Sequence, residues 1–222
     1  MQTNYSFGSQ SREQSLQINS VLRNTYALLS MTLLFSAVVA YFSMAMNMPY
    51  PGIIITLVGF YGLLFAIHKF QNSGVGLVLT FALTGFMGYT LGPILNLYLS
   101  LSNGDQIVAS ALGLTGFVFL GLSAYALTTK RDLSFLSSFL FAGFFVLIGA
   151  MLLGFFMNIP GLHLAISAGF VLFSSAAILL QTQMIVNGGE RNYILATVTL
   201  FVSIYNLFLS LLQLLGAFGG QD

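Results

Sequence analysis

Charged residues and cysteine are what this sequence has least of. Lys and Arg contribute 6 and Asp and Glu contribute 5 of the 222 residues, which is 5% in total, and there is no cysteine. A soluble domain carries roughly 25% charged residues, and so few charges cannot cover a water-exposed surface. The composition therefore excludes a soluble enzyme, and also a nucleic-acid-binding protein, which needs a basic face. The lack of cysteine excludes disulfides, cysteine-ligated zinc and iron–sulfur clusters.

Apolar residues, in contrast, gather in long runs. A helix needs about 20 apolar residues to cross the hydrocarbon core of a bilayer, and seven stretches meet this length: 22–46, 52–70, 75–99, 107–127, 133–157, 162–186 and 193–217. The runs are continuous rather than alternating, which disfavours an outer-membrane β-barrel. The sequence predicts an all-α, polytopic membrane protein: a seven-transmembrane-helix bundle in one membrane domain, residues 21–222.

The few cations predict the orientation of this bundle. They lie before the first run, at the very end of a run, or in the second, fourth and sixth connections: Arg12, Arg23, Lys69, Lys130, Arg131 and Arg191. All six thus fall on one side of the membrane, which the positive-inside rule assigns to the cytoplasm. We expect a cytoplasmic N-terminus and, with seven spans, a periplasmic C-terminus.

The first twenty residues differ in kind from the rest. Twelve of them are Ser, Thr, Asn or Gln, without an apolar period. Such a segment buries too little surface to offset its ordering entropy. Residues 1–20 are therefore expected to be a flexible cytoplasmic tail.

Few residues inside the predicted spans could carry chemistry. Ionisable side chains within a membrane often mark ion pathways, but the interior of the seven runs contains no Asp, Glu, Lys or Arg, which disfavours a coupled transporter. Four amides remain, and interhelical hydrogen bonding is the favoured role for each: Asn96, Gln181, Gln183 and Asn206. Gly88, Gly92 and Pro93 form a small-residue motif that suits close helix packing.

One serine and one histidine of the predicted spans are candidates for a catalytic dyad. Ser123 lies in the fourth run and His163 near the start of the sixth. By helical rise the two are separated by roughly 19 Å in depth, whereas a nucleophile and its base must approach to about 3 Å. No catalytic, cofactor or metal site is expected, and the chain is predicted not to be an enzyme.

Three segments resemble the Bax inhibitor-1 family. They are residues 22–30 (LRNTYALLS), 88–96 (GYTLGPILN) and 205–212 (YNLFLSLL). The similarity is closest to the bacterial YccA branch of that family. It implies a seven-helix bundle in the bacterial inner membrane that modulates FtsH, a membrane-anchored ATP-dependent protease.

The same resemblance implies an alternative function. Calcium-leak members of the family use a pair of aspartates on the last two helices, and these positions correspond here to Gln181 and Ser203. Neither side chain titrates, whereas a carboxylate pair sharing a proton would be pH-sensitive. We therefore expect a regulator of the FtsH protease that acts as a competing substrate. The alternative is a calcium or proton leak lined by Gln181, Ser203 and Asn206.

Overall fold

The structure, a computed structural model, describes residues 4–157 and 159–219, with side chains from residue 16 onward. The described chain consists of seven α-helices long and apolar enough to cross a membrane, which confirms the predicted fold class. Their bounds are α1 Asn4–Ala45, α2 Ile53–Phe70, α3 Gly74–Leu99, α4 Gly104–Thr128, α5 Phe135–Phe156, α6 Leu162–Val186 and α7 Tyr193–Gly219. Each observed helix overlaps one predicted span, and the ends of α2 to α7 differ from the prediction by at most three residues.

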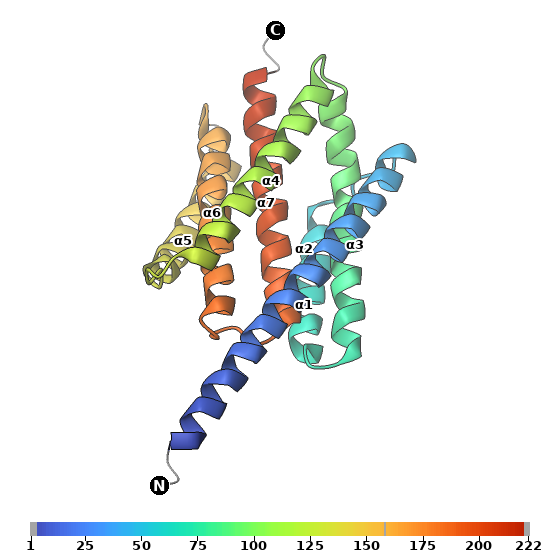
Figure 1. The fold of residues 1–222 in the computed structure, drawn as a ribbon. Coiled ribbons are helices and arrows are strands. Elements are labelled where there is room, and N and C mark those ends of the chain that lie inside the picture. The colour runs from blue at the N-terminus through green and yellow to red at the C-terminus, as the bar shows by residue number, and fades with distance from the viewer. Residues whose placement is uncertain (1–3, 158, 220–222) are drawn as a thin grey trace.

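The first part of α1 precedes the predicted membrane span. Residues 4–20 are helical and continuous with the first span, where a flexible tail is expected. The segment contains no proline and a single glycine, and extending an existing helix costs far less than nucleating one. Figure 1 shows this part of α1 extending beyond the other helices. The division into a tail and a membrane domain remains a proposal.

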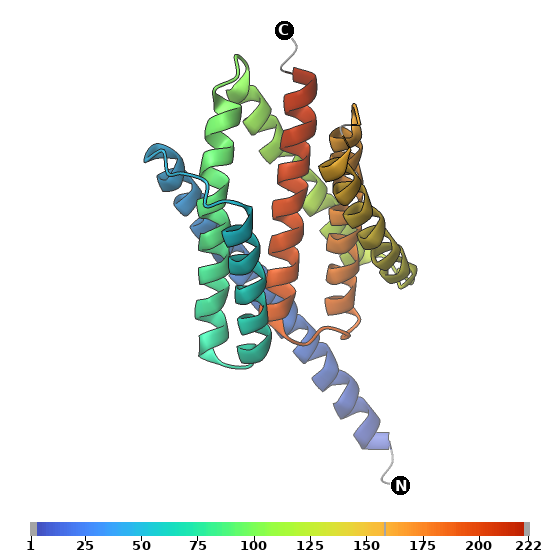
Figure 2. The same ribbon diagram turned by 180° about the vertical axis from the view of Figure 1, so that it is seen from behind.

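Helix α7 forms the centre of the bundle. It has the largest buried share of the seven spans, while α2 and α5 have the smallest. Figures 1 and 2 show the other helices arranged around it, and α7 packs directly against α1, α3, α4 and α6. The largest apolar cluster includes Leu29 of α1, Leu83 of α3, Ile178 of α6, and Phe201 and Leu207 of α7.

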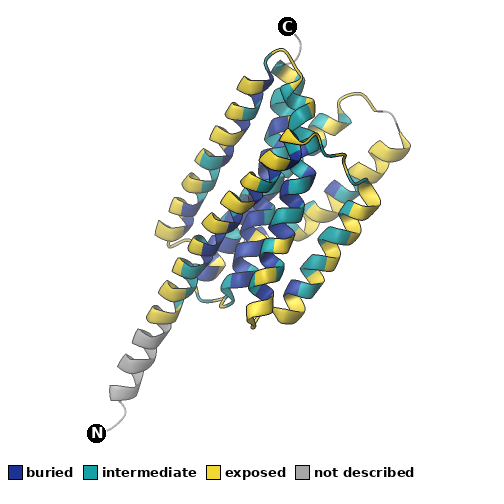
Figure 3. Ribbon diagram, turned by 90° about the vertical axis from the view of Figure 1, so that its right-hand side faces the viewer, coloured by how far each residue is buried: buried dark blue, intermediate teal, exposed yellow. Residues whose placement is uncertain are grey.

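Burial in the other helices follows their position. In Figure 3 buried residues concentrate in the middle of the bundle, and exposed ones lie on its outer surface. Helix α5 packs mainly on α6 and exposes large apolar side chains such as Phe141, Phe145 and Phe155. A surface of this composition suits contact with lipid rather than water.

Helices α1 and α3 form the most extensive helix pair. A Cβ atom at Gly88 would overlap the backbone of Ser36, and one at Gly92 would overlap Ser43 and the backbone of Met44. The two glycines thus let the helices approach closely, as small residues do in membrane helix pairs. Near the end of the same interface, the Asn96 amide donates to the carbonyl of Met44 at 3.0 Å.

Candidate functional site

Three connections and the N-terminal part of α1 meet at one end of the bundle, which we call the cationic end. Its connections are residues 71–73, 129–134 and 187–192, and exposed cations there include Lys69, Lys130, Arg131 and Arg191. The other end carries the connections 46–52, 100–103 and 157–161, which contain no Lys or Arg. The structure thus places these cations together, as the sequence pattern predicts.

Asn192 joins two of the connections at the cationic end. Its Oδ1 accepts hydrogen bonds from the backbone N–H groups of Ile194 at 2.9 Å and Leu195 at 3.2 Å, which caps the first turn of α7. Its Nδ2 donates to the carbonyl of Gln71 at 3.1 Å and to Oδ1 of Asn72 at 2.9 Å. One side chain therefore both starts the central helix and holds the connection between α2 and α3.

Gln183 fixes the third connection. Its Nε2 donates to the carbonyl of Arg131 at 2.6 Å, and its Oε1 accepts from the backbone N–H of Leu133 at 3.0 Å. The amide is buried, so these bonds satisfy polar groups that would be costly to leave unpaired. Arg131 is thereby held beside the end of α6.

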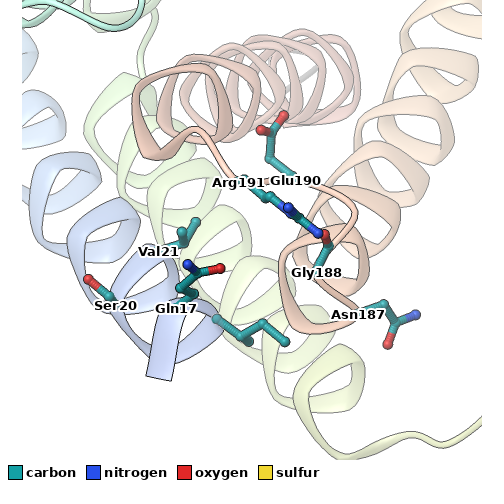
Figure 4. A pocket seen from close by; sticks show the side chains of 8 residues that line it. Gln17, Ser20, Val21, Asn187, Gly188, Glu190 and Arg191 are labelled. Carbon is teal, nitrogen blue, oxygen red and sulfur yellow. The ribbon is translucent and has the colours of Figure 1, made fainter. Parts of the chain in front are cut away.

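A cavity of about 450 Å³ lies between α1 and the connection from α6 to α7. Figure 4 shows Gln17 and Val21 of α1 facing the loop that carries Gly188 and Arg191. The loop turns at Gly188, whose φ is 73°, a left-handed conformation that glycine adopts without strain. Arg191 Nε donates to the carbonyl of Gly188 at 3.3 Å.

Arg191 also borders a second cavity, on its other side. This cavity, of about 370 Å³, lies between residues 71–77 and 191–194. Arg191 is exposed, whereas its neighbour Glu190 is half-buried and accepts a hydrogen bond from the backbone N–H of Asn192 at 2.8 Å. The cationic end therefore has two cavities that Arg191 borders, with both polar and apolar residues in their linings, formed by α1 and loops far apart in the sequence.

The structure distributes the three predicted polar residues of the bundle interior over different surroundings. Gln181 is buried in α6, and its Nε2 has no hydrogen-bond partner among the described residues. Ser203 is buried in α7 and donates to the carbonyl of Thr199 at 2.8 Å. Asn206 borders a largely apolar cavity of about 350 Å³ between α2, α3, α5, α6 and α7. Among the hydrogen bonds of the described residues, none joins these three side chains to one another.

Gln181 belongs to a wider group of buried polar atoms. Within the described part of the chain, five such atoms without a partner lie in the half of the bundle nearest the cationic end: Thr25 Oγ1, Tyr26 OH, Ser123 Oγ, Gln181 Nε2 and Thr182 Oγ1. They come from α1, α4 and α6, and Thr197 of α7 donates to the carbonyl of Thr25 at 3.2 Å. The sequence does not indicate which serine and threonine hydroxyls lack a partner, because these residues are common in membrane helices, where they usually bond to their own backbone.

The serine–histidine pair does not assemble. Ser123 is buried near the cationic end of α4, whereas His163 is exposed in the first turn of α6, at the opposite end. Residue 123 lies roughly 28 Å along α4 from that end. In addition, the described residues contain no group of three or more His, Cys, Asp or Glu side chains that could hold a metal ion.

Comparison with known proteins now assigns the family. The family described as "Inhibitor of apoptosis-promoting Bax1" matches residues 18–220. The chain belongs to this family, and together with the seven apolar helices this makes it a multi-pass membrane protein.

Individual relatives cover nearly the whole chain. An uncharacterized protein of Pseudomonas aeruginosa is 62% identical over 218 residues, 98% of both chains. A protein of Escherichia coli K12 named "Modulator of FtsH protease YccA" is 53% identical over 214 residues, 96% of this chain and 97% of the relative. An uncharacterized membrane protein of Vibrio cholerae is 48% identical over 213 residues, 96% of both chains.

Proposed function

We propose that this chain is an inner-membrane modulator of an FtsH-type protease, a membrane-anchored enzyme that degrades proteins at the expense of ATP. The support is the 53% identity, over 96% of the chain, to the E. coli protein named as a modulator of that protease. A protein of E. coli O6:H1, also 53% identical over 214 residues, is named an inner membrane protein. In this account the chain has no catalytic role of its own.

The proposed orientation brings the cationic end to the cytoplasm. Positive residues next to membrane helices are retained on the cytoplasmic side, and the connections at the other end have none. The N-terminus is then cytoplasmic and the C-terminus periplasmic. The two cavities that Arg191 borders would face the compartment that supplies ATP.

The structural observation that carries the proposal is the start of α1. Residues 4–15 extend beyond the other helices (Figure 1) and belong to a segment rich in Ser, Gln and Asn. An unfolding ATPase needs a terminus that it can grip. A polar segment that extends beyond the other helices supplies one.

The bundle behind this segment resists extraction. Pulling on α1 would have to break its contacts with α3 and with the central helix α7. The close approach at Gly88 and Gly92 and the hydrogen bond from Asn96 belong to this interface. A chain that is gripped readily and unfolded slowly occupies the protease, and so acts as a competing substrate.

The test is a deletion of residues 2–15, which leaves Gln17 and Val21 at their cavity beside the loop. A matched control carries residues 2–15 in scrambled order, with the same length and composition. We expect the protease to degrade the wild type and the scrambled chain at similar rates and the deleted chain at least several-fold more slowly. Equal degradation of all three would overturn the role of this segment.

A second candidate function, a calcium or proton leak through the bundle, has one observation in its favour. The unpartnered buried atoms of Thr25, Ser123 and Gln181 could bond to water or to an ion in an open state. The interior, however, has no carboxylate. Flux through reconstituted liposomes between about pH 5 and 8, where histidine titrates, separates the two functions. Flux equal to that of empty liposomes excludes the leak, and flux abolished by Gln181→Leu favours it.

A further inference from the structure

A second kind of cavity lies within the membrane-spanning part, between α1 and α4. It has a volume of about 440 Å³, and its lining comes from α1, α3, α4 and α7, with Leu33, Met44, Val108, Phe119 and Tyr205 among the residues that form it. Among the described residues, no charged side chain contributes to the lining. Pockets of this size and composition commonly hold small apolar ligands.

The cavity opens to the side of the bundle. Helix α1 packs on α3 and α7, and α4 packs on α6 and α7, but α1 and α4 make at most marginal contact with each other. Figure 1 shows both helices in front of α7, so α7 and α3 form the floor of the cavity. Its mouth therefore faces the hydrocarbon of the bilayer.

The depth of the cavity matches one leaflet. It begins near the end opposite the cations, at Met44 of α1 and Val108 of α4, and reaches Phe119 of α4. Positions 108 and 119 are separated by about 16 Å of helix. This is close to half of the bilayer core, which is about 30 Å thick.

The side chains that α3 and α7 contribute to the lining are apolar apart from Tyr205, whose hydroxyl has a partner elsewhere. The Tyr205 hydroxyl lies 3.1 Å from Oγ1 of Thr90 on α3. The aromatic ring is left to face the cavity, and it stacks beside Phe201 with a centroid separation of 6.4 Å. A hydrocarbon chain would meet ring faces and methyl groups.

From this geometry we propose that the cavity is a binding site for one acyl chain of a zwitterionic phospholipid, taken from the leaflet at the end opposite the cations. A protein helix does not fit, since a single turn of about 5.4 Å length and 10 Å width would fill the volume. The headgroup would lie near Asp105, at an end whose connections contain no Lys or Arg. That end disfavours the carboxylate of a free fatty acid or an anionic headgroup.

Two glycines of α4 provide a matched test. A Cβ atom at Gly116 or at Gly113 would lie more than 4 Å from every atom of the described residues other than its chain neighbours and the nearby backbone of its own helix. Gly116 borders the cavity, whereas Gly113 is exposed on the same helix and is not part of the lining. Gly116→Leu therefore fills the cavity, and Gly113→Leu adds the same side chain outside it. Should Gly116→Leu fail to fold, Ala37→Phe fills the cavity from α1.

The measurement is saturable photo-crosslinking of the purified, delipidated full chain by phosphatidylethanolamine that carries a diazirine in the middle of one acyl chain. We expect labelling of α1 and α4 in the wild type and in Gly113→Leu. The apparent affinity should fall about tenfold or more in the filled variant. Equal labelling of the filled variant, or non-saturable labelling that includes α5, would overturn the site. Stronger competition by oleic acid or phosphatidylglycerol than by unlabelled phosphatidylethanolamine would overturn the assignment of the ligand.

Discussion

Ser43 of α1 donates a hydrogen bond to the carbonyl of Tyr89 on α3 at 2.8 Å. In a regular helix this carbonyl would accept from the backbone N–H of residue 93, but residue 93 is proline and has no N–H. The serine of a neighbouring helix thus satisfies an acceptor that the proline leaves free. The backbone hydrogen bond that α3 lacks at Pro93 is thus replaced by a hydrogen bond between α1 and α3.

The first prediction concerns this link. Ser43→Ala leaves the Tyr89 carbonyl without the hydroxyl, and we expect the unfolding free energy in mild detergent to fall by about 1 to 2 kcal/mol. Ser30→Ala is the control, because Ser30 is exposed on the same helix and bonds only to the carbonyl of Tyr26, one turn back. A loss no greater than that of the control would show that the link contributes nothing.

The second prediction tests the glycines of α3. Gly92→Ala forces a Cβ atom against Ser43 and Met44, so we expect α1 and α3 to separate at a cost of about 1 to 3 kcal/mol in unfolding free energy. Gly113→Ala places the same methyl group in open space and should leave stability unchanged or raise it by up to about 1 kcal/mol. Thermal unfolding of both variants checks this, and similar melting temperatures would contradict close packing at Gly92.

The third prediction separates the two roles of Asn192. Asn192→Ala removes both the cap of α7 and the bonds to Gln71 and Asn72, whereas Asn192→Asp keeps an acceptor for the cap and loses the donor. The lost cap should cost about 1 kcal/mol in Asn192→Ala. In hydrogen exchange, Asn192→Asp should deprotect residues 71–73 while the first turn of α7 stays protected. Equal deprotection of both segments in the two variants would contradict separate roles.

The fourth prediction concerns orientation, and the lack of native cysteine makes it simple to test. Ser134 at the cationic end and Ser102 at the other end are both exposed. A membrane-impermeant maleimide should label Ser102→Cys in intact spheroplasts and Ser134→Cys only after lysis. The reverse pattern would place the cationic end in the periplasm and contradict the proposed access of the protease.

Composition and spacing carry most of the information about this fold. Long apolar runs separated by turn residues locate all seven helices, because a bilayer leaves the backbone few alternatives to a helix. The start of α1 could not be placed this way, since residues 4–20 lack an apolar period and are helical as an extension of the span that follows.

The polar contacts of the cationic end were less accessible to sequence analysis. Gln183 stands out as an amide near the end of a span, yet its partners at Arg131 and Leu133 lie in a distant loop. The sequence places Asn192 in a loop but does not indicate its bonds to Gln71 and Asn72, which lie about 120 residues away. The cavity between α1 and α4 exists because these two helices are separated from each other. Apolar runs in a sequence predict helices but not the distances between them.

The most direct test of the account is the rate at which purified FtsH-type protease degrades a model membrane substrate in proteoliposomes that contain increasing amounts of this chain. The account predicts a saturable fall in substrate degradation with the wild type and with the scrambled variant. It predicts little or no fall with the chain that lacks residues 2–15. A substrate degradation rate that does not change as the wild-type chain is added would contradict it.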